Sequence, residues 1–175
     1  MTVKYDKHYA ASDKACGEAF EPIVSFAREL TPQARVLDLG CGQGRDAVLF
    51  ARLGHRVVGV DVSSVGVEQL NAIAEREGLS IEAEVGDVVS YTPTGRFDVV
   101  LLDRVLHMLS SDDDRRVVLN KGCAATAASG HLLISEYPKQ RDMLAAYFGL
   151  RPDWTVRLER KGFLFVQRGA EPSPE

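Results

Sequence analysis

The amino-acid sequence predicts an α/β fold: a three-layer αβα sandwich around a mostly parallel seven-stranded sheet, with an antiparallel strand in a C-terminal hairpin. Short apolar segments alternate with amphipathic segments of helical length, which is typical of a parallel sheet covered on both faces. The first apolar segment runs into a glycine-rich turn and then a helix. Near the C-terminus, two strand-like segments are joined only by Lys161 and Gly162, which predicts a hairpin.

Strands are predicted from apolar runs and from alternation of apolar with polar residues. In chain order they cover residues 36–39, 56–61, 79–85, 97–103, 131–137, 154–160 and 163–167. The run at 97–103 is the most apolar of them. Pro93 with Gly95, and later Gly130, interrupt the pattern and predict turns.

Helices are predicted where apolar residues recur every three to four positions. They cover residues 18–30, 46–51, 64–77, 139–148, and a segment that begins at the cap candidates 110–114 and ends near 125. Ser63 or Ser64 is expected to cap the helix that runs to Glu77, and Gly78 is expected to end it.

At 175 residues, the chain is expected to form one domain with a substantial core, covering residues 18–169. Residues 1–17 contain Tyr5 and Tyr9 but show no strong period, and we predict that they form a lid over the functional site. Residues 170–175 are rich in proline and glutamate and are predicted to be a disordered tail.

The composition argues against several classes of protein. A net charge of −4 provides no basic surface of the kind that nucleic acids require. No apolar run reaches the length of a membrane span, and the N-terminus lacks the apolar core of a secretion signal. The three cysteines have no metal-ligand spacing and leave an odd thiol. We therefore expect a cytoplasmic protein without a metal site and without nucleic-acid or membrane partners.

The glycine-rich turn distinguishes two classes of cofactor. The sequence Asp38-Leu39-Gly40-Cys41-Gly42-Gln43-Gly44-Arg45 has glycine at every second position. A dinucleotide-binding turn instead has the spacing G-x-G-x-x-G, and Arg45 occupies its last glycine position here. The segment resembles motif I of the class I S-adenosylmethionine-dependent methyltransferases, [D/E]-x-G-x-G-x-G. This resemblance implies a Rossmann-like fold, S-adenosylmethionine as the cofactor and S-adenosylhomocysteine as the product.

A narrower resemblance adds the type of acceptor. The segments Leu37 to Asp46, Leu53-Gly54 and Val58 to Asp61 are similar to the small methyltransferases of the tellurite-resistance and thiopurine types. The similarity covers residues 36–109 well and the remainder poorly. It implies an enzyme that methylates a small-molecule acceptor, but it does not name that acceptor.

Polar groups follow four of the predicted strands, at the edge of the sheet where open α/β proteins bind ligands. Asp61 is expected to accept both ribose hydroxyls, and Asp87 to accept the adenine amino group, with Val62 and Val88 against the adenine faces. The predicted cofactor-binding residues are Asp38, Gly40, Cys41, Gly42, Gly44, Asp61, Val62, Asp87, Val88, Asp103 and Arg104. Each acid could instead cap a loop or a helix.

Methyl transfer demands little chemistry of the protein, because the sulfonium is already an activated donor that needs alignment and exclusion of water. A base is required only where the acceptor is protonated. His107, just after the fourth strand, is the candidate base, although its apolar neighbours also suit a structural histidine. Tyr9 is the second catalytic candidate, and it could equally pack on the domain surface.

Two other functions remain open from the sequence. One is a non-catalytic cofactor-binding or regulatory protein on the same fold. The other is an NAD-type dinucleotide-binding oxidoreductase, although the glycine spacing and the small number of residues left for a substrate domain count against it. The expected partner is a small-molecule methyl acceptor, and the protein is expected to be a monomer or a homodimer.

Overall fold

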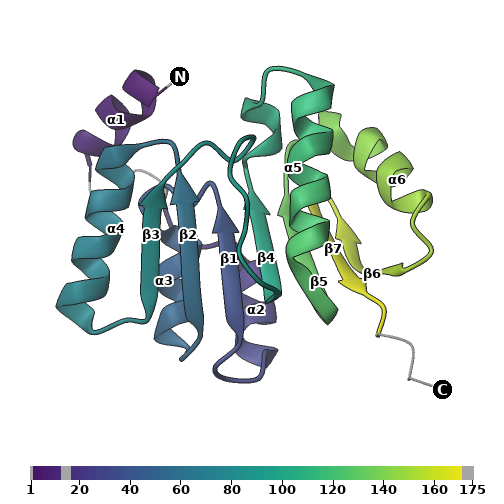
Figure 1. The fold of residues 1–175 in the computed structure, drawn as a ribbon, viewed down its shortest axis with the longest axis horizontal. Coiled ribbons are helices and arrows are strands. Elements are labelled where there is room, and N and C mark those ends of the chain that lie inside the picture. Colours follow the sequence, from purple (N-terminus) through teal and green to yellow (C-terminus); the bar gives the residue numbers. More distant parts are fainter. Residues whose placement is uncertain (1, 13–16, 171–175) are drawn as a thin grey trace. The chain divides into compact units, whose positions relative to one another are not determined.

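The structure, a computed structural model, describes residues 2–12 and 17–170. Among these residues, seven strands form one mixed sheet in the order β3-β2-β1-β4-β5-β7-β6, and helices flank it. The predicted α/β fold is therefore confirmed. The chain divides into two compact units, residues 1–91 and residues 92–175. Figure 1 labels the helices and strands of each.

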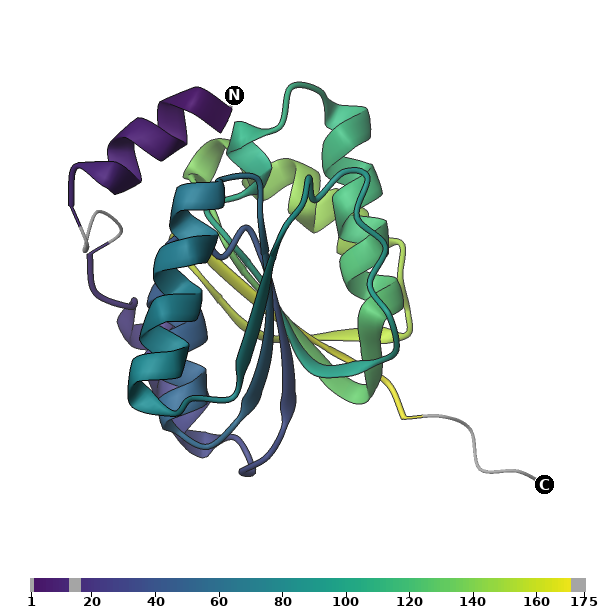
Figure 2. The ribbon, with the colours of Figure 1, turned by 60° about the vertical axis from the view of Figure 1, so that its left-hand side comes forward.

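The first unit alternates helices with parallel strands. Its elements are α1 (Thr2–Ala10), α2 (Glu21–Glu29), β1 (Arg35–Leu39), α3 (Arg45–Arg52), β2 (Arg56–Asp61), α4 (Ser64–Glu77) and β3 (Ile81–Val85). Strand β2 pairs in parallel with both β1 and β3, which places Leu37 beside Val58 and Val57 beside Ile81. Figure 2 shows α2, α3 and α4 on the same side of these three strands.

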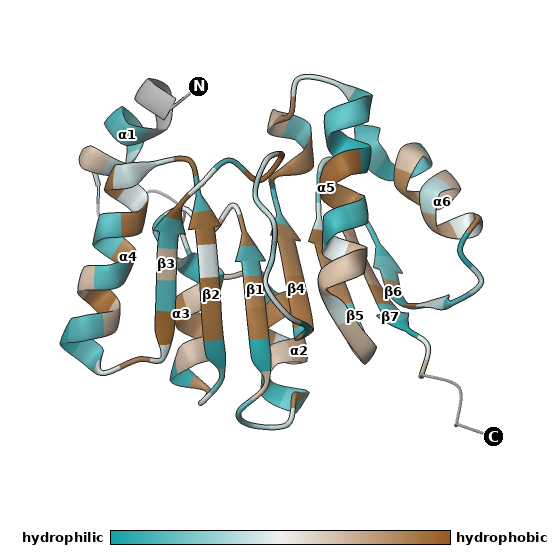
Figure 3. Ribbon diagram, in the orientation of Figure 1, coloured by the Kyte–Doolittle hydropathy of each residue, from teal (hydrophilic) through white to brown (hydrophobic). Residues whose placement is uncertain are grey.

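The local signals of the sequence explain these elements. Four of the five β1 residues are buried, and β1 and β2 are mostly hydrophobic whereas β3 is more hydrophilic (Figure 3). The Ser63 hydroxyl caps α4 by accepting the N–H of Gly66 at 3.1 Å. Gly78 follows α4 with a φ of 63°, in the left-handed conformation that commonly ends a helix. Both predicted ends of this helix are confirmed.

The second unit ends in the antiparallel part of the sheet. Its elements are β4 (Phe97–Asp103), the short 3-10 helix η1 (Leu106–Met108), α5 (Asp112–Ala125), β5 (Thr126–Ser135), the 3-10 helix η2 (Pro138–Gln140), α6 (Arg141–Gly149), β6 (Trp154–Arg160) and β7 (Phe163–Arg168). Strand β5 runs parallel to β4, and β7 is inserted antiparallel between β5 and β6. The predicted hairpin around Lys161 and Gly162 is confirmed.

The beginning of β5 differs from the prediction. The strand starts at Thr126 rather than at His131, and its pairing with β4 shifts between Phe97 and Val99. Gly130 belongs to this irregularity: a Cβ atom there would lie 2.9 Å from the carbonyl oxygen of Asp98. The glycine therefore permits close backbone approach at a bulge, whereas the sequence predicted a turn.

Candidate active site

The loop between β1 and α3, called the glycine loop (residues 40–44), has a backbone that explains its spacing. Gly40, Gly42 and Gly44 have φ angles of 87°, 52° and 86°. Residues with a Cβ atom rarely adopt this left-handed region. Gly44 has a second reason, since a Cβ atom there would lie 2.2 Å from the Leu70 side chain. The alternation of glycine with other residues thus follows from the path of the backbone.

Cys41 lies within the glycine loop but its side chain is turned into the sheet. The residue is 6% exposed, and its Sγ would lie 2.9 Å from a Cβ atom added to Gly59 on β2. Its backbone N–H donates to the carbonyl oxygen of Val60. The backbone of Cys41, rather than its thiol, therefore shapes the glycine loop.

Gly66 is a residue of this site that the sequence analysis missed. A Cβ atom on Gly66 would lie 2.9 Å from the carbonyl oxygen of Gly42 and 3.1 Å from the ring of Tyr9. Glycine at this position lets α4 approach the glycine loop closely. An isolated glycine inside a helical pattern was the available signal.

Asp61, at the end of β2, is joined directly to the glycine loop. One carboxylate oxygen accepts the N–H of Gly42 at 2.9 Å, and the other accepts the N–H of Ser63 at 2.8 Å. Burial raises the pKa of the Asp61 carboxyl, and these two hydrogen bonds oppose that rise. Each carboxylate oxygen can accept more than one hydrogen bond, so the group retains capacity for two hydroxyl donors.

Asp38, the acid of the glycine motif, is 3% exposed beneath the loop. Burial raises the pKa of its carboxyl well above the usual range, and the nearby Asp46 carboxylate raises the pKa further. The Arg45 guanidinium, the Asp61 carboxylate and the backbone N–H of Ala47 contribute smaller effects, of which only that of Asp61 also raises the pKa. Arg45 forms an ion pair with Asp46 at 3.2 Å. The buried carboxyls of Asp38 and Asp46 therefore lie near a single guanidinium, that of Arg45.

Replacing Asp38 with asparagine is expected to stabilise the fold at neutral pH, because the amide avoids burial of a charge. A carboxyl whose folded-state pKa lies above its unfolded value, about 3.9, favours folding below that value and loses this contribution as the pH rises. The stability difference between variant and wild type, measured by urea unfolding, should therefore be largest near neutral pH. It should disappear near pH 4. Asp142→Asn, at an exposed position of α6, is the control. A difference that grows on acidification would contradict the prediction.

The remaining predicted cofactor residues of the first unit lie after β2 and β3. Asp87 is exposed, and its carboxylate accepts the N–H of Val89 at 2.8 Å. Val62 and Val88 are partly exposed. The Asp87 carboxylate therefore caps its own loop and can still accept a further hydrogen bond. This is compatible with a structural cap and with the predicted contact to the adenine amino group.

Helix α1 lies against α4, as Figure 2 shows. The carbonyl oxygen of Tyr9 accepts hydrogen bonds from the side-chain amides of Gln43 and Gln69, each at 3.3 Å. The Gln43 amide also donates to the Ser12 carbonyl oxygen at 2.6 Å. Gln43, in the glycine loop, therefore connects the loop with the N-terminal segment, a role that no sequence pattern indicated.

Two further observations concern the predicted lid. The Ser63 hydroxyl donates to the Asp6 carboxylate at 2.5 Å, so α1 also contacts the turn that follows β2. Tyr9 is 7% exposed and packs on Gly66. The Tyr5 side chain and residues 13–16 lie outside the described part of the chain, as do residues 171–175 of the predicted tail.

In the second unit, polar groups gather where β4 and β5 end. Asp103 is 8% exposed. Arg104 has a φ of 59°, and its N–H donates to the carbonyl oxygen of Ser135 at 2.8 Å. Its guanidinium lies 4.5 Å from the centre of the Tyr137 ring. A left-handed arginine is uncommon, and such backbone strain is frequent at functional sites.

His107 pairs with a carboxylate that the sequence analysis did not select. Its Nδ1 lies 3.0 Å from Oε2 of Glu136, which is buried, while its own side chain is 17% exposed. The Glu136 carboxylate also accepts the backbone N–H groups of His107 and Tyr137. An ionised carboxylate only accepts, so a neutral imidazole in this pair carries its proton on Nδ1 and presents a lone pair at Nε2. We call these two residues the His–Glu pair.

Comparison with known proteins identifies the family. Residues 36–130, more than half of the chain, match the family described as "Methyltransferase domain". The chain belongs to this methyltransferase family. A curated relative, the ubiquinone biosynthesis O-methyltransferase of Bradyrhizobium sp. (strain ORS 278), is 35% identical over 57% of the chain, which spans only 38% of that relative.

Two solved structures show the same fold at low identity. TehB from Haemophilus influenzae has a TM-score of 0.75 and 19% identity, with 95% of this chain and 67% of that chain covered. The N-methyltransferase NodS from Bradyrhizobium japonicum, in complex with S-adenosylhomocysteine, has a TM-score of 0.77 and 14% identity, with 95% and 97% covered. The predicted resemblance to methyltransferases is confirmed by the family match. The two solved structures add that the fold is shared.

The described residues offer neither a membrane-spanning helix nor a metal-binding cluster. None of their helices is both long enough and apolar enough to cross a membrane. Within the same residues, no group of three or more histidine, cysteine or acidic side chains is arranged to hold a metal ion.

Proposed function

We propose that this methyltransferase transfers a methyl group from S-adenosylmethionine to a small-molecule acceptor. The observation that carries the proposal is the connection of Asp61 to the left-handed glycine loop through the N–H of Gly42. The relatives support methyl transfer in general, since their names specify both O- and N-methylation. The choice of a small molecule rests on the resemblance to small methyltransferases found in the sequence.

The residues of the first unit fit the cofactor chemically. Asp61 retains acceptor capacity for two ribose hydroxyls, and the glycine loop offers backbone without side chains at Gly40, Gly42 and Gly44. Asp87, Val62 and Val88 are accessible for the adenine. When bound, the cofactor supplies an electrophilic methyl group on a positively charged sulfur.

The residues of the second unit supply a route for a proton. With Nδ1 held by Glu136, the Nε2 atom of His107 can accept a proton from a hydroxyl or ammonium acceptor. Asp103 and Arg104 are proposed to contribute to the cofactor side, as predicted from the sequence. An acceptor that is already deprotonated would not need His107.

The proposal is tested first by cofactor binding and then by turnover. S-Adenosylmethionine and S-adenosylhomocysteine should raise the melting temperature, because a ligand that binds only the folded state stabilises it, whereas NAD should not. Screening small phenols, amines and thiols with labelled S-adenosylmethionine then separates an enzyme from a non-catalytic binding protein. Stabilisation by NAD alone would overturn the cofactor assignment.

Replacing Asp61 with alanine is expected to weaken binding of S-adenosylmethionine by at least about tenfold, or about 1.4 kcal/mol, measured by calorimetry. Each hydrogen bond to a charged acceptor is worth about 1.5–3 kcal/mol net. Asp142→Ala, at an exposed position of α6, is the control for the loss of an acid. A loss below about twofold in Asp61→Ala would place the ribose elsewhere.

Deleting residues 1–17 is expected to weaken cofactor binding by about tenfold and to lower turnover without unfolding the core. We propose that α1 covers the site and gains protection when the cofactor binds, which excludes water. Hydrogen exchange with and without S-adenosylhomocysteine should show added protection of α1. Equal exchange in both states, together with full activity of the truncated protein, would make the segment a simple extension.

A further inference from the structure

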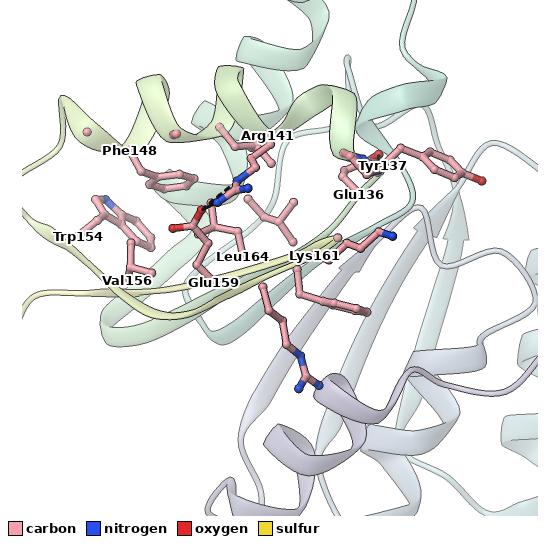
Figure 4. A pocket seen from close by; sticks show the side chains of 17 residues that line it. Glu136, Tyr137, Arg141, Phe148, Trp154, Val156, Glu159, Lys161 and Leu164 are labelled. Carbon is pink, nitrogen blue, oxygen red and sulfur yellow. Dashed lines mark hydrogen bonds and ion pairs between the residues drawn. The ribbon is translucent and has the colours of Figure 1, made fainter.

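A cavity of about 490 Å³ lies within the second unit, between α6 and the strands β5, β6 and β7 (Figure 4). Its lining runs from Ile134 to Leu164 and includes no residue predicted from the sequence to bind the cofactor. The volume lies within the range of small-molecule sites.

One end of the cavity is aromatic. Phe148 of α6 and Trp154 of β6 have ring centres 5.8 Å apart in an edge-to-face arrangement, and both are less than 10% exposed. Leu144, Val156 and Leu164 extend this apolar wall. In the view of Figure 4, Phe148 and Trp154 lie together, and Glu136, Tyr137 and Lys161 lie toward the opposite end. A ring placed at the aromatic end would lose its water-exposed surface.

The charged side chains of the lining favour an anion. They comprise three cations, Arg141, Arg160 and Lys161, and two acids, Glu136 and Glu159. Glu136 already accepts backbone N–H groups and faces His107. Glu159 is paired with Arg141 at 3.1 Å. The lining therefore has a net positive charge although the whole chain has a net charge of −4.

We propose that this cavity binds a small aromatic carboxylate, with its ring against the wall formed by Phe148 and Trp154 and its acid group toward Arg141 and Lys161. The Arg141 guanidinium donates from Nε and Nη2 to Glu159, so its Nη1 group is the one that would donate to a ligand carboxylate, and the side chain is 71% exposed. Lys161, in the β6–β7 turn, adds a second cation. The proposal concerns binding and does not rest on methyl transfer.

The chain contains its own reporter for this test. Trp154 is the sole tryptophan, so its fluorescence reports the occupancy of the cavity. The full chain is titrated with 4-phenylbutyrate and with 4-phenylbutylammonium, which share a phenyl ring and differ in charge. The acid should change the Trp154 emission saturably and bind about three- to fivefold more tightly than the ammonium, the range expected for exposed charge pairs.

Matched variants locate the binding. Ala145 lines the cavity, whereas its neighbour Ala146 is exposed on the same helix and does not. Ala145→Phe should weaken binding of 4-phenylbutyrate by about tenfold, or about 1.4 kcal/mol, and Ala146→Phe should change it by less than about twofold. Lys161→Glu should remove the preference for the acid, while Lys139→Glu, outside the lining, should preserve it.

Several results would overturn the proposal. The first is a Trp154 emission that stays unchanged up to the solubility limit of 4-phenylbutyrate. The second is equal affinity for the acid and the ammonium. The third is an equal effect of Ala145→Phe and Ala146→Phe on binding. If Ala145→Phe fails to fold, the lysine pair decides, because both lysines are exposed on the surface. Equal behaviour of Lys161→Glu and Lys139→Glu would then reject the anionic ligand.

Discussion

Replacing Gly42 with valine is expected to abolish measurable binding of S-adenosylmethionine, a loss of more than about a hundredfold or about 2.7 kcal/mol. Gly42 has a φ of 52°, which is unfavourable for any residue with a Cβ atom and more so for a branched one. The new side chain would also stand on the loop where the cofactor has to approach. The N–H of Gly42 also donates to the Asp61 carboxylate, so distortion of the loop would disturb the proposed ribose acceptor as well.

Gly78→Val is the control that separates backbone strain from obstruction of the cofactor site. Gly78 has a φ of 63°, close to that of Gly42, and open space surrounds the position that its Cβ atom would occupy. The same backbone strain at the end of α4 should lower the melting temperature while the cofactor affinity stays within about twofold. Calorimetry on both variants makes the comparison. Unchanged affinity in Gly42→Val would show that the glycine loop is not the cofactor site.

Replacing His107 with glutamine is expected to reduce turnover of a hydroxyl or ammonium acceptor by at least about a hundredfold, the usual contribution of a positioned base. Binding of S-adenosylmethionine should be unchanged if the His–Glu pair serves the acceptor, as proposed. The measurement is kcat for methyl transfer across a pH series, with the cofactor affinity determined in parallel. His131→Gln, on β5, is the control for loss of a histidine.

Glu136 is proposed as a positioning residue that acts through His107. Glu136→Gln should lower kcat less than His107→Gln does and should shift the pH–rate profile, because the amide can no longer act as a charged acceptor for Nδ1. A merely structural glutamate would lower stability and leave the profile in place. Equal turnover of wild type and His107→Gln with a protonated acceptor would remove the base from the mechanism.

The elements with local signals were predictable. The range 56–61 of β2 and the range 64–77 of α4 agree with the structure, since apolar runs and cap residues are encoded within a few positions. The start of β5 was not, because it depends on the contact of Gly130 with the Asp98 backbone across two strands. Helix α1 also escaped prediction, since its contacts reach residues more than thirty positions away, such as Gln43.

The candidate site shows the same division. Asp61 follows from its place at a strand end, and its contact with Gly42 is consistent with that prediction. Glu136 comes directly after the fifth strand, so the rule that selected Asp61 and Asp103 at strand ends could have selected it too. The cavity beneath α6 has no sequence pattern, because its walls come from one helix and three strands and its volume depends on their spacing.

The insertion of β7 between β5 and β6 has a consequence during protein synthesis. Strand β5 pairs with β7 from His131 to Ser135. One edge of β5 therefore stays without its hydrogen-bond partners until β7 has left the ribosome. At about 5–20 residues per second, the interval between Ser135 and Arg168 lasts roughly two to seven seconds. An apolar edge that contains Leu132, Leu133 and Ile134 is then open to pairing with other chains. A nascent chain stalled in this interval should therefore depend on chaperones more than one stalled after β7 has emerged.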